Sequence, residues 1–193
     1  MTSFEYNFDE SILSPKEDEV VRVVFTTPLN EGRLREFCLE NGIVNYLPLQ
    51  KVCRTMRRGY KNKSYEYQAV VLRPMFPSYI FVKMLPEQRS RIFRSNSVVR
   101  ILGVEDAGQE RLLDEIRLIR QIETIAKDEE LEFNADIKEG GKFLIESGVW
   151  QGVYGWLVKK RKRFLWTVEI ECVNSFVRAT IDPTQYKMTP VQE

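Results

Sequence analysis

The residue types that usually carry catalysis are sparse in this chain of 193 residues. It contains no histidine, and this removes the commonest general base and the commonest metal ligand together. Cys38, Cys53 and Cys172 lie far apart and form no CxxC pair, so neither a zinc knuckle nor a thioredoxin motif is present. We therefore expect no catalytic residue, no metal and no cofactor, and we interpret the cysteines as neutral thiols in a reducing compartment.

Basic residues, in contrast, are clustered as a polyanion-binding protein would need them. The 29 Lys and Arg nearly balance the 28 Asp and Glu overall, but residues 51–94 contain eleven basic and only two acidic side chains. Residues 105–139 contain twelve acidic and five basic side chains, and five consecutive basic residues follow at 159–163. This asymmetry predicts a polyanion that contacts only part of the surface.

The part of the chain up to residue 125 alternates strand and helix patterns. β-Branched runs predict strands, and apolar residues at helical spacing predict helices. In order, they are a strand at 19–25, a helix at 31–41, a hairpin over 51–69 with its tip at 58–62, a strand at 78–82, a short helix after Pro86, a strand at 98–102 and a helix at 110–125. Asn30 is the expected N-cap of the first helix, and Ile92 and Phe93 are expected to point inward.

The C-terminal part has a different pattern. Five short strands with glycine turns are predicted at 142–145, 154–158, 164–170, 176–181 and near Met188, which is typical of a small closed β-barrel. The resulting fold class is α+β. Its four segments are an acidic flexible arm (1–19), a mixed α/β domain with an antiparallel sheet and flanking helices (20–125), an acidic linker (126–138) and the barrel (139–193).

Neither a membrane span nor a signal peptide is indicated. No stretch approaches the roughly 18–20 apolar residues that are needed to cross a bilayer. The first 19 residues lack the basic-then-apolar order of a signal peptide. We expect a cytoplasmic monomer.

Two segments carry a resemblance to a known family. Residues 73–82 (RPMFPSYIFV) resemble the phenylalanine-proline-small-tyrosine strand of NusG-type transcription elongation factors, whose N-terminal domain is called NGN. Residues 46–48, 58–59 and 97–103 follow the family order, and residues 148–157 resemble its SH3-like KOW barrel. Val21, Ser97, Ile101 and Val149 depart from the family pattern, which favours a specialised paralogue of the RfaH or capsule-operon antiterminator kind.

The resemblance implies that the NGN-like domain binds RNA polymerase. The family's apolar contact residues correspond to Phe25, Tyr79, Phe81 and Val98. Aromatic residues dominate interface energetics, but the same side chains could instead fill the domain's own core. Arg89, Ser90 and Arg91 correspond to positions where relatives touch a polymerase loop, with a plain solvated helix face as the alternative.

Two basic sets are expected to bind nucleic acid. The hairpin set is expected on the non-template DNA strand, with arginines on phosphates and a tyrosine stacking on bases. It consists of Arg57, Arg58, Tyr60, Lys61, Lys63 and Arg73. The barrel set is expected on nascent or ribosomal RNA, and consists of Lys159, Lys160, Arg161, Lys162 and Arg163. For both sets, a merely solvated turn is the alternative.

The barrel is expected to dock a protein partner. Trp150, Tyr154 and Trp156 flank its glycines; at least one should be core, and an exposed one would suit docking. In relatives the partner is a small-subunit ribosomal protein or a termination factor. We expect a stable barrel and not the helical hairpin that some KOW modules form, because valine, isoleucine and aromatic residues favour strands.

Three function classes follow. The leading one is a transcription elongation and antitermination factor that binds RNA polymerase and suppresses pausing or termination on particular operons, such as those for polysaccharide synthesis. The second is a stand-alone RNA-binding or translation-associated module built on the barrel. An enzyme is disfavoured, because the chain has no P-loop, no dinucleotide fingerprint and no convincing carboxylate pair.

Overall fold

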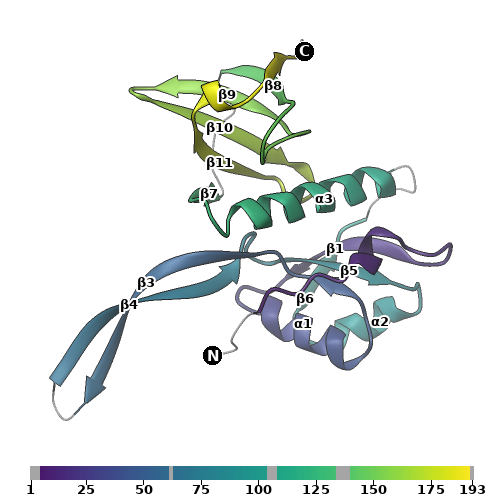
Figure 1. The fold of residues 1–193 in the computed structure, drawn as a ribbon. Coiled ribbons are helices and arrows are strands. Elements are labelled where there is room, and N and C mark those ends of the chain that lie inside the picture. The colour runs from purple at the N-terminus through teal and green to yellow at the C-terminus, as the bar shows by residue number, and fades with distance from the viewer. Residues whose placement is uncertain (1–4, 61–62, 104–107, 134–139, 192–193) are drawn as a thin grey trace.

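A long helix, α3 (Gln109–Ile125), lies between two separate antiparallel sheets (Figure 1). The computed structural model describes residues 5–60, 63–103, 108–133 and 140–191. Leu112, Ile116, Ile119 and Ile122 of α3 are buried, as their helical spacing predicts. They belong to one apolar cluster that contains residues from both sheets. The protein is thus a mixed α/β fold in which one helix is shared by two layers.

The N-terminal sheet has the strand order β2-β5-β1-β6. Its strands are β1 (Val20–Thr26), β2 (Asn45–Tyr46), β5 (Tyr79–Met84) and β6 (Val98–Ile101). Alternation along β1 directs Val23 toward α3 and Val24 toward the opposite face. That opposite face is covered by α1 (Glu31–Glu40) and α2 (Gln88–Phe93), whose Leu34, Cys38 and Ile92 are fully buried.

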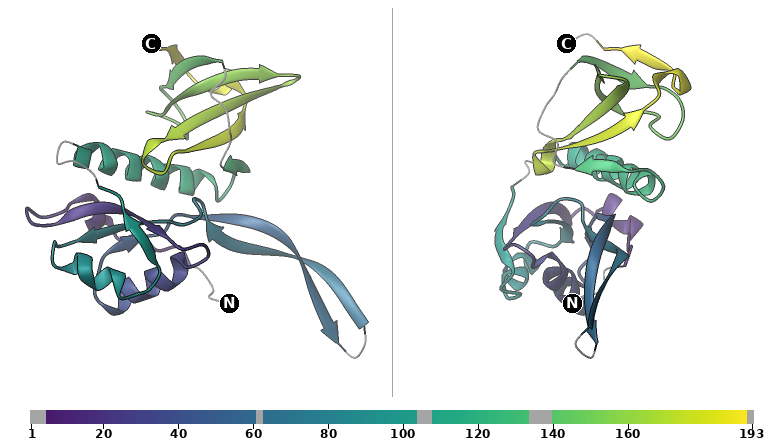
Figure 2. Two further views of the ribbon diagram at one scale, coloured as in Figure 1. Left: turned by 180° about the vertical axis from the view of Figure 1, so that it is seen from behind. Right: turned by 90° about the vertical axis from the view of Figure 1, so that its left-hand side faces the viewer.

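A long hairpin projects from this layer. Strands β3 (Leu49–Tyr60) and β4 (Lys63–Pro74) pair residue for residue, from Leu49 with Pro74 at the base to Tyr60 with Lys63 at the tip. They form a two-stranded sheet of their own. Figure 1 and the left view of Figure 2 show the outer half of this ribbon extending beyond the two layers.

The C-terminal sheet has the order β12-β8-β9-β10-β11-β7. Its strands are β7 (Leu131–Phe133), β8 (Gly141–Ile145), β9 (Tyr154–Lys160), β10 (Arg163–Ile170), β11 (Ser175–Ile181) and β12 (Met188–Pro190). The five predicted strands are all present. Among the described residues, however, no ladder joins β7 to β12, so the sheet is open and the predicted closed barrel is not found.

The described part of the acidic N-terminal segment, residues 5–19, is packed against the domain, although the sequence predicts a flexible arm. Residues Glu10–Leu13 form a short 3-10 helix, and Ile12 is fully buried against the cluster around α3. The ring of Phe8 packs edge-on against the ring of Tyr46, with centroids 4.8 Å apart. The guanidinium of Arg120 also lies 4.8 Å from the centroid of the Phe8 ring. A few well-spaced apolar side chains therefore outweigh the negative charge of the segment.

The acidic segment after α3 also takes part in the fold. Residues 131–133, predicted as linker, form β7 and pair with β11. Phe133 packs edge-on against Phe76 of the N-terminal layer, with ring centroids 6.3 Å apart. Leu131 and Phe133 alternate with Glu132, and this short period of two is sufficient for an edge strand.

One local prediction is confirmed and another is wrong. Asn30 is the N-cap residue of α1, as predicted, although its side chain makes no cap hydrogen bond and its amide instead donates to the carbonyl of Pro28 at 3.2 Å. Phe93, predicted to point inward, is 41% exposed, whereas its neighbour Ile92 is buried in the cluster on the α1 side of the sheet, because successive residues of a helix point about 100° apart. Within the described residues, no helix combines the length and apolar character needed to cross a membrane.

The Gly155→Ala variant should lose stability because Gly155 lies against the chain beside it. An added Cβ would lie 2.6 Å from the carbonyl oxygen of Thr167 and 2.8 Å from the Trp166 ring. We expect a loss of about 1–3 kcal/mol, seen as a melting temperature lower by about 2–4 °C per kcal/mol. Gly59→Ala, which meets nothing within 4 Å, is the matched control and should melt like the parent. Equal melting of both variants would contradict the packing described.

Candidate nucleic-acid interface

The two faces of the hairpin differ in composition. Directly opposed residues of an antiparallel pair share a face, and successive residues alternate between faces. One face, here called the tyrosine face, carries Arg54, Met56, Arg58, Tyr65, Tyr67 and Ala69. The other, here called the polar face, carries Cys53, Thr55, Arg57, Ser64, Glu66, Gln68 and Val70.

Side chains of the polar face bind one another. The guanidinium of Arg57 donates to Ser64 Oγ at 3.2 and 3.0 Å, and Arg57 lies directly opposite Glu66. Gln68 Nε2 donates to Thr55 Oγ1 at 2.9 Å. On the polar face, therefore, several side chains already hydrogen-bond to one another, and the positive charge of Arg57 lies opposite the negative charge of Glu66.

The predicted DNA-binding residues are spread along the ribbon. Arg57 and Arg58 are exposed near the tip, but on opposite faces. Tyr60 and Lys63 form the last pair of the ladder, and Arg73 is exposed at its base. Lys61 lies outside the described residues. Sequence reasoning missed Arg54, Tyr65 and Tyr67; the i, i+2 spacing of the tyrosines was the available signal.

The base of the hairpin is held by a buried carboxylate of α3. Glu123 is 1% exposed and accepts hydrogen bonds from the Leu49 backbone N–H at 2.8 Å and from the Tyr46 hydroxyl at 3.2 Å. Arg120, one turn earlier, forms an ion pair with it. Burial, reinforced by the nearby Glu123, raises the pKa of Tyr46 well above its ordinary value, which keeps the phenol protonated as a donor.

The same helix also binds the C-terminal layer. The Glu115 carboxylate accepts from the backbone N–H groups of Glu171 at 3.0 Å and Cys172 at 2.7 Å. Gln121 Nε2 donates to the carbonyls of Val149 and Gln151 at 2.9 and 3.2 Å. These four bonds are made on α3 itself, so the helix positions both layers.

The predicted polymerase-contact residues do not form one surface. Phe25 and Tyr79 are partly exposed neighbours with ring centroids 5.2 Å apart, and Arg100 lies 5.5 Å from the Phe25 ring. Phe81 is fully buried in the cluster around α3 and stacks on Tyr46 at 6.1 Å. Its prediction as an outward contact is wrong, because it lies on the sheet face that packs into the cluster around α3.

Val98 is separated from that pair. It packs with Val24 and Ile80 in the cluster on the α1 side of the sheet, since the register of β1 and β6 shifts between Phe25 and Thr26. Arg89, Ser90 and Arg91 are exposed on α2. The members of the predicted set that remain at least partly exposed are therefore Phe25, Tyr79 and these three α2 residues, although Tyr79 also packs against the cluster around α3.

The predicted RNA-binding run, residues 159–163, is exposed and spans the end of β9, the turn at 161–162 and the first residue of β10. Arg161 adopts φ 56° there, a left-handed conformation that is uncommon outside glycine and is typical of tight turns. Lys159 Nζ lies 5.3 Å from the ring centroid of Phe164. The turn thus presents basic side chains on a β-hairpin, as predicted.

The three aromatic residues of the C-terminal layer have different environments. Trp150 is fully buried and belongs to the core, so it is unavailable as a docking residue. Tyr154 is 54% exposed. Trp156 is half-buried beneath the Lys142 ammonium, which lies 5.2 Å from the ring.

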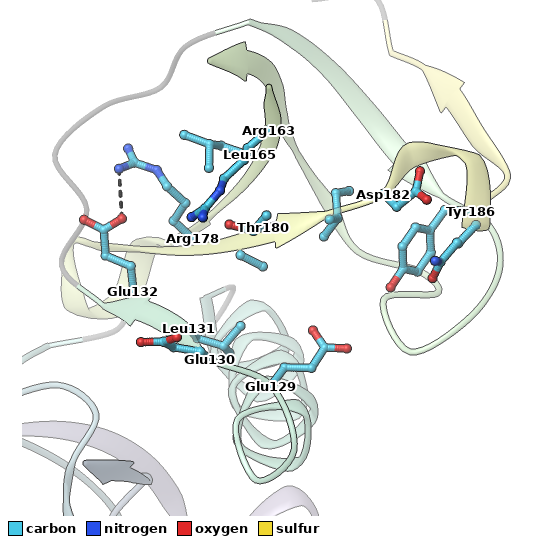
Figure 3. Close-up of a pocket in the computed structure, with 13 residues that line it drawn as sticks. Glu129, Glu130, Leu131, Glu132, Arg163, Leu165, Arg178, Thr180, Asp182 and Tyr186 are labelled. Carbon is cyan, nitrogen blue, oxygen red and sulfur yellow. Dashed lines mark hydrogen bonds and ion pairs between the residues drawn. The ribbon is translucent and has the colours of Figure 1, made fainter. Parts of the chain in front are cut away.

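A hollow of about 830 Å³ lies where the end of α3 and β7 approach β10 and β11 (Figure 3). Arg163 and Arg178 enter it, and Arg178 donates to Glu132 at 3.1 Å. Burial, with Asp128 nearby, raises the pKa of Glu129. The acidic side chains that line the hollow are Glu129, Glu130, Glu132 and Asp182. The negative segment therefore offsets the positive charge here, and the hollow is a poor phosphate site.

Two of the three cysteines, Cys38 and Cys172, are not arranged for chemistry, whereas Cys53 is exposed on the hairpin. Burial raises the pKa of the Cys38 thiol to about 12 and, with Glu115 adding to the effect, also raises the pKa of Cys172. A thiol held neutral in this way is a poor nucleophile and a poor metal ligand. Over the described part of the chain, no group of three or more potential metal ligands is found.

Replacing Glu123 should weaken the fold strongly. Glu123→Ala removes the acceptor of the Leu49 N–H and the Tyr46 hydroxyl, so we expect a loss of about 2–4 kcal/mol in the free energy of unfolding. Asp114→Ala changes the same charge on the same helix, but its ion pair with Arg117 is exposed and should cost less than about 1 kcal/mol. Urea unfolding of both variants checks this, and similar losses would refute the role given to Glu123.

Comparison with known proteins gives one family. The family model described as "Transcription termination factor nusG" matches residues 22–120. No curated protein matches the chain. Among solved structures, Thermotoga maritima NusG, described for its domain interaction, is 16% identical with a TM-score of 0.45 and covers 88% of this chain and 96% of its own. The MjSpt4:Spt5 complex is 13% identical with a TM-score of 0.27 and covers 90% and 99%. Such scores are too low to carry an argument, so the assignment depends on the family model.

Proposed function

The chain belongs to the NusG family, and we propose that it is a transcription elongation and antitermination factor that binds RNA polymerase through its N-terminal layer. Members of this family are transcription elongation factors. The observation that carries the proposal is a basic hairpin extending from the very domain that the family model matches. A factor that binds polymerase and nucleic acid at the same time needs a polymerase-binding surface and a nucleic-acid-binding element in the same domain.

The polymerase-binding surface in this proposal consists of the predicted contact residues that are exposed or partly exposed. Phe25 and Tyr79 offer a partly exposed aromatic pair, of the kind that concentrates binding energy at interfaces. Arg89, Ser90 and Arg91 on α2 offer a second, polar contact. Phe81 is not included, because it supports the core beneath α3.

The hairpin would contact the unpaired non-template DNA strand beside the polymerase. Its strands carry six Lys and Arg residues against Glu66 alone, so phosphate attraction is favoured. Suppression of pausing or termination follows if a factor bound to polymerase and DNA together stabilises the elongating complex. Action on particular operons, such as those for polysaccharide synthesis, is the specialised form of this proposal.

The C-terminal layer would recruit further partners. Tyr154 is the most exposed of its three predicted docking residues, and a ribosomal protein or a termination factor is the proposed class of partner. The basic turn at 159–163 would contact nascent RNA. A stand-alone RNA-binding module is the second candidate, favoured by this exposed turn.

Binding to polymerase tests the proposal. The purified protein should comigrate with core RNA polymerase in gel filtration and increase read-through of a terminator in vitro. Tyr79→Ala should weaken polymerase binding about tenfold or more, since it truncates an aromatic contact. Leu39→Ala, which truncates an exposed apolar side chain of α1, should bind like the parent.

Two results would contradict the proposal or support the second candidate. If the parent protein binds neither core polymerase nor a paused elongation complex, the proposal is wrong. If RNA binding is then found and is lost when Lys159, Lys160 and Lys162 are replaced together by glutamine, the second candidate is supported.

A further inference from the structure

The tyrosine face of the hairpin has the composition of a single-strand binding surface. Tyr65 and Tyr67 are 51% and 42% exposed, although large aromatic side chains are normally buried. Arg58 lies directly opposite Tyr65, and Met56 directly opposite Tyr67. This face carries no acidic residue from Arg54 to Arg58 or from Tyr65 to Ala69. Aromatic rings beside unopposed arginines are the usual means of binding unpaired nucleic acid.

The spacing of the two rings selects an unpaired strand over a duplex. Their centroids are 6.1 Å apart with an interplanar angle of 39°. Stacked bases in a duplex strand are separated by about 3.4 Å. Adjacent bases that stack on Tyr65 and Tyr67 must therefore be pulled apart from each other, and an unpaired strand permits this without the unstacking cost that a duplex would incur.

The arginines of the two faces differ in availability. Arg57, on the polar face, is engaged by Ser64 and faces Glu66. Arg54 and Arg58, on the tyrosine face, make no hydrogen bond or ion pair within the described part of the chain, and both are exposed. Two neighbouring arginines of equal charge thus have unequal capacity to bind a phosphate.

We propose that the tyrosine face binds a single strand of DNA, with bases stacked on Tyr65 and Tyr67 and with phosphates paired to Arg54 and Arg58. This inference rests on the proposed function, which supplies an unpaired DNA strand at this hairpin. DNA is the occupant on this ground alone, and binding to RNA is one of the outcomes that the test below distinguishes. The polar face turns away from the strand.

Two neighbouring substitutions with the same charge change test the choice of face. Binding of the full-length protein to a fluorescent twelve-nucleotide oligo(dT) is measured by anisotropy over a range of salt concentrations. Arg58→Gln should weaken binding about tenfold and lower the salt slope by about 0.7, the value for one phosphate contact with a single strand. Arg57→Gln, the matched control, should change the affinity less than about threefold. Equal effects of the two would overturn the proposal, because they would indicate charge attraction without a preferred face.

A second set of variants tests whether the aromatic rings of Tyr65 and Tyr67 stack on the bases. Tyr65→Ala and Tyr67→Ala should each weaken binding about tenfold, whereas Tyr65→Phe and Tyr67→Phe keep the stacking surface and should bind like the parent. Circular dichroism confirms that the variants are folded, since these side chains lie on an exposed ribbon. If the phenylalanine variants lose as much affinity as the alanine variants, stacking is not the mode of binding.

Three further outcomes separate this inference from the proposed function. Binding to oligo(U), or to a duplex of the same length, that exceeds binding to oligo(dT) overturns the inference. Failure to bind oligo(dT) while the protein still binds core polymerase overturns the inference and leaves the proposed function intact. Binding to oligo(dT) without binding to polymerase supports the tyrosine face and overturns the proposed function.

Discussion

The burial of helix α3 on two sides is the constraint on which the rest of the structure depends. Its apolar side chains complete the cores of both layers, and its polar side chains bind the backbone of both. Gln109 pairs with the backbone of Val21 through its amide, donating and accepting one hydrogen bond each, at 3.0 and 2.9 Å. Glu123 holds the base of the hairpin, and Glu115 and Gln121 hold the opposite layer. A buried polar group costs free energy unless it is bonded, so the buried Glu123 fixes the register of the helix on the hairpin side, and the more exposed bonds of Glu115 and Gln121 add to the contact on the other side.

This arrangement explains how a nearly neutral chain presents a strongly basic element. Residues 131–133 of the acidic segment after α3 pair with β11, and the Glu132 carboxylate accepts a hydrogen bond from Arg178 at 3.1 Å. This negative charge is therefore neutralised within the C-terminal layer, while the hairpin of β3 and β4 extends away from that layer (Figure 2). Because screening limits exposed charges to a range of about 8–10 Å, the two regions act separately. The hairpin is left free to attract phosphate, and its anchor on Glu123 sets the direction in which it points.

Much of the fold could be predicted from sequence, because regular periods mark most of its elements. The β-branched run of β1, the helical spacing in α3 and the short strands after residue 140 all have a clear period. The packing of Ile12 and the pairing of Leu131 could not be predicted, since each depends on partners distant in the chain and is hidden within acidic surroundings. Phe81 has the alternation of an outward residue, but it lies on the sheet face that packs into the cluster around α3.

The candidate site was harder to predict than the fold, for a physical reason. A basic cluster indicates phosphate attraction without a direction, and only the register of β3 with β4 assigns Arg57 and Arg58 to different faces. That register also brings Tyr65 beside Arg58. The most direct measurement is photo-crosslinking in a transcription elongation complex, with a photoreactive amino acid at position 65 or position 66 of the hairpin. The account predicts a crosslink to the non-template strand from position 65 and little from position 66. No crosslink from position 65, or equal crosslinking from both, would contradict it.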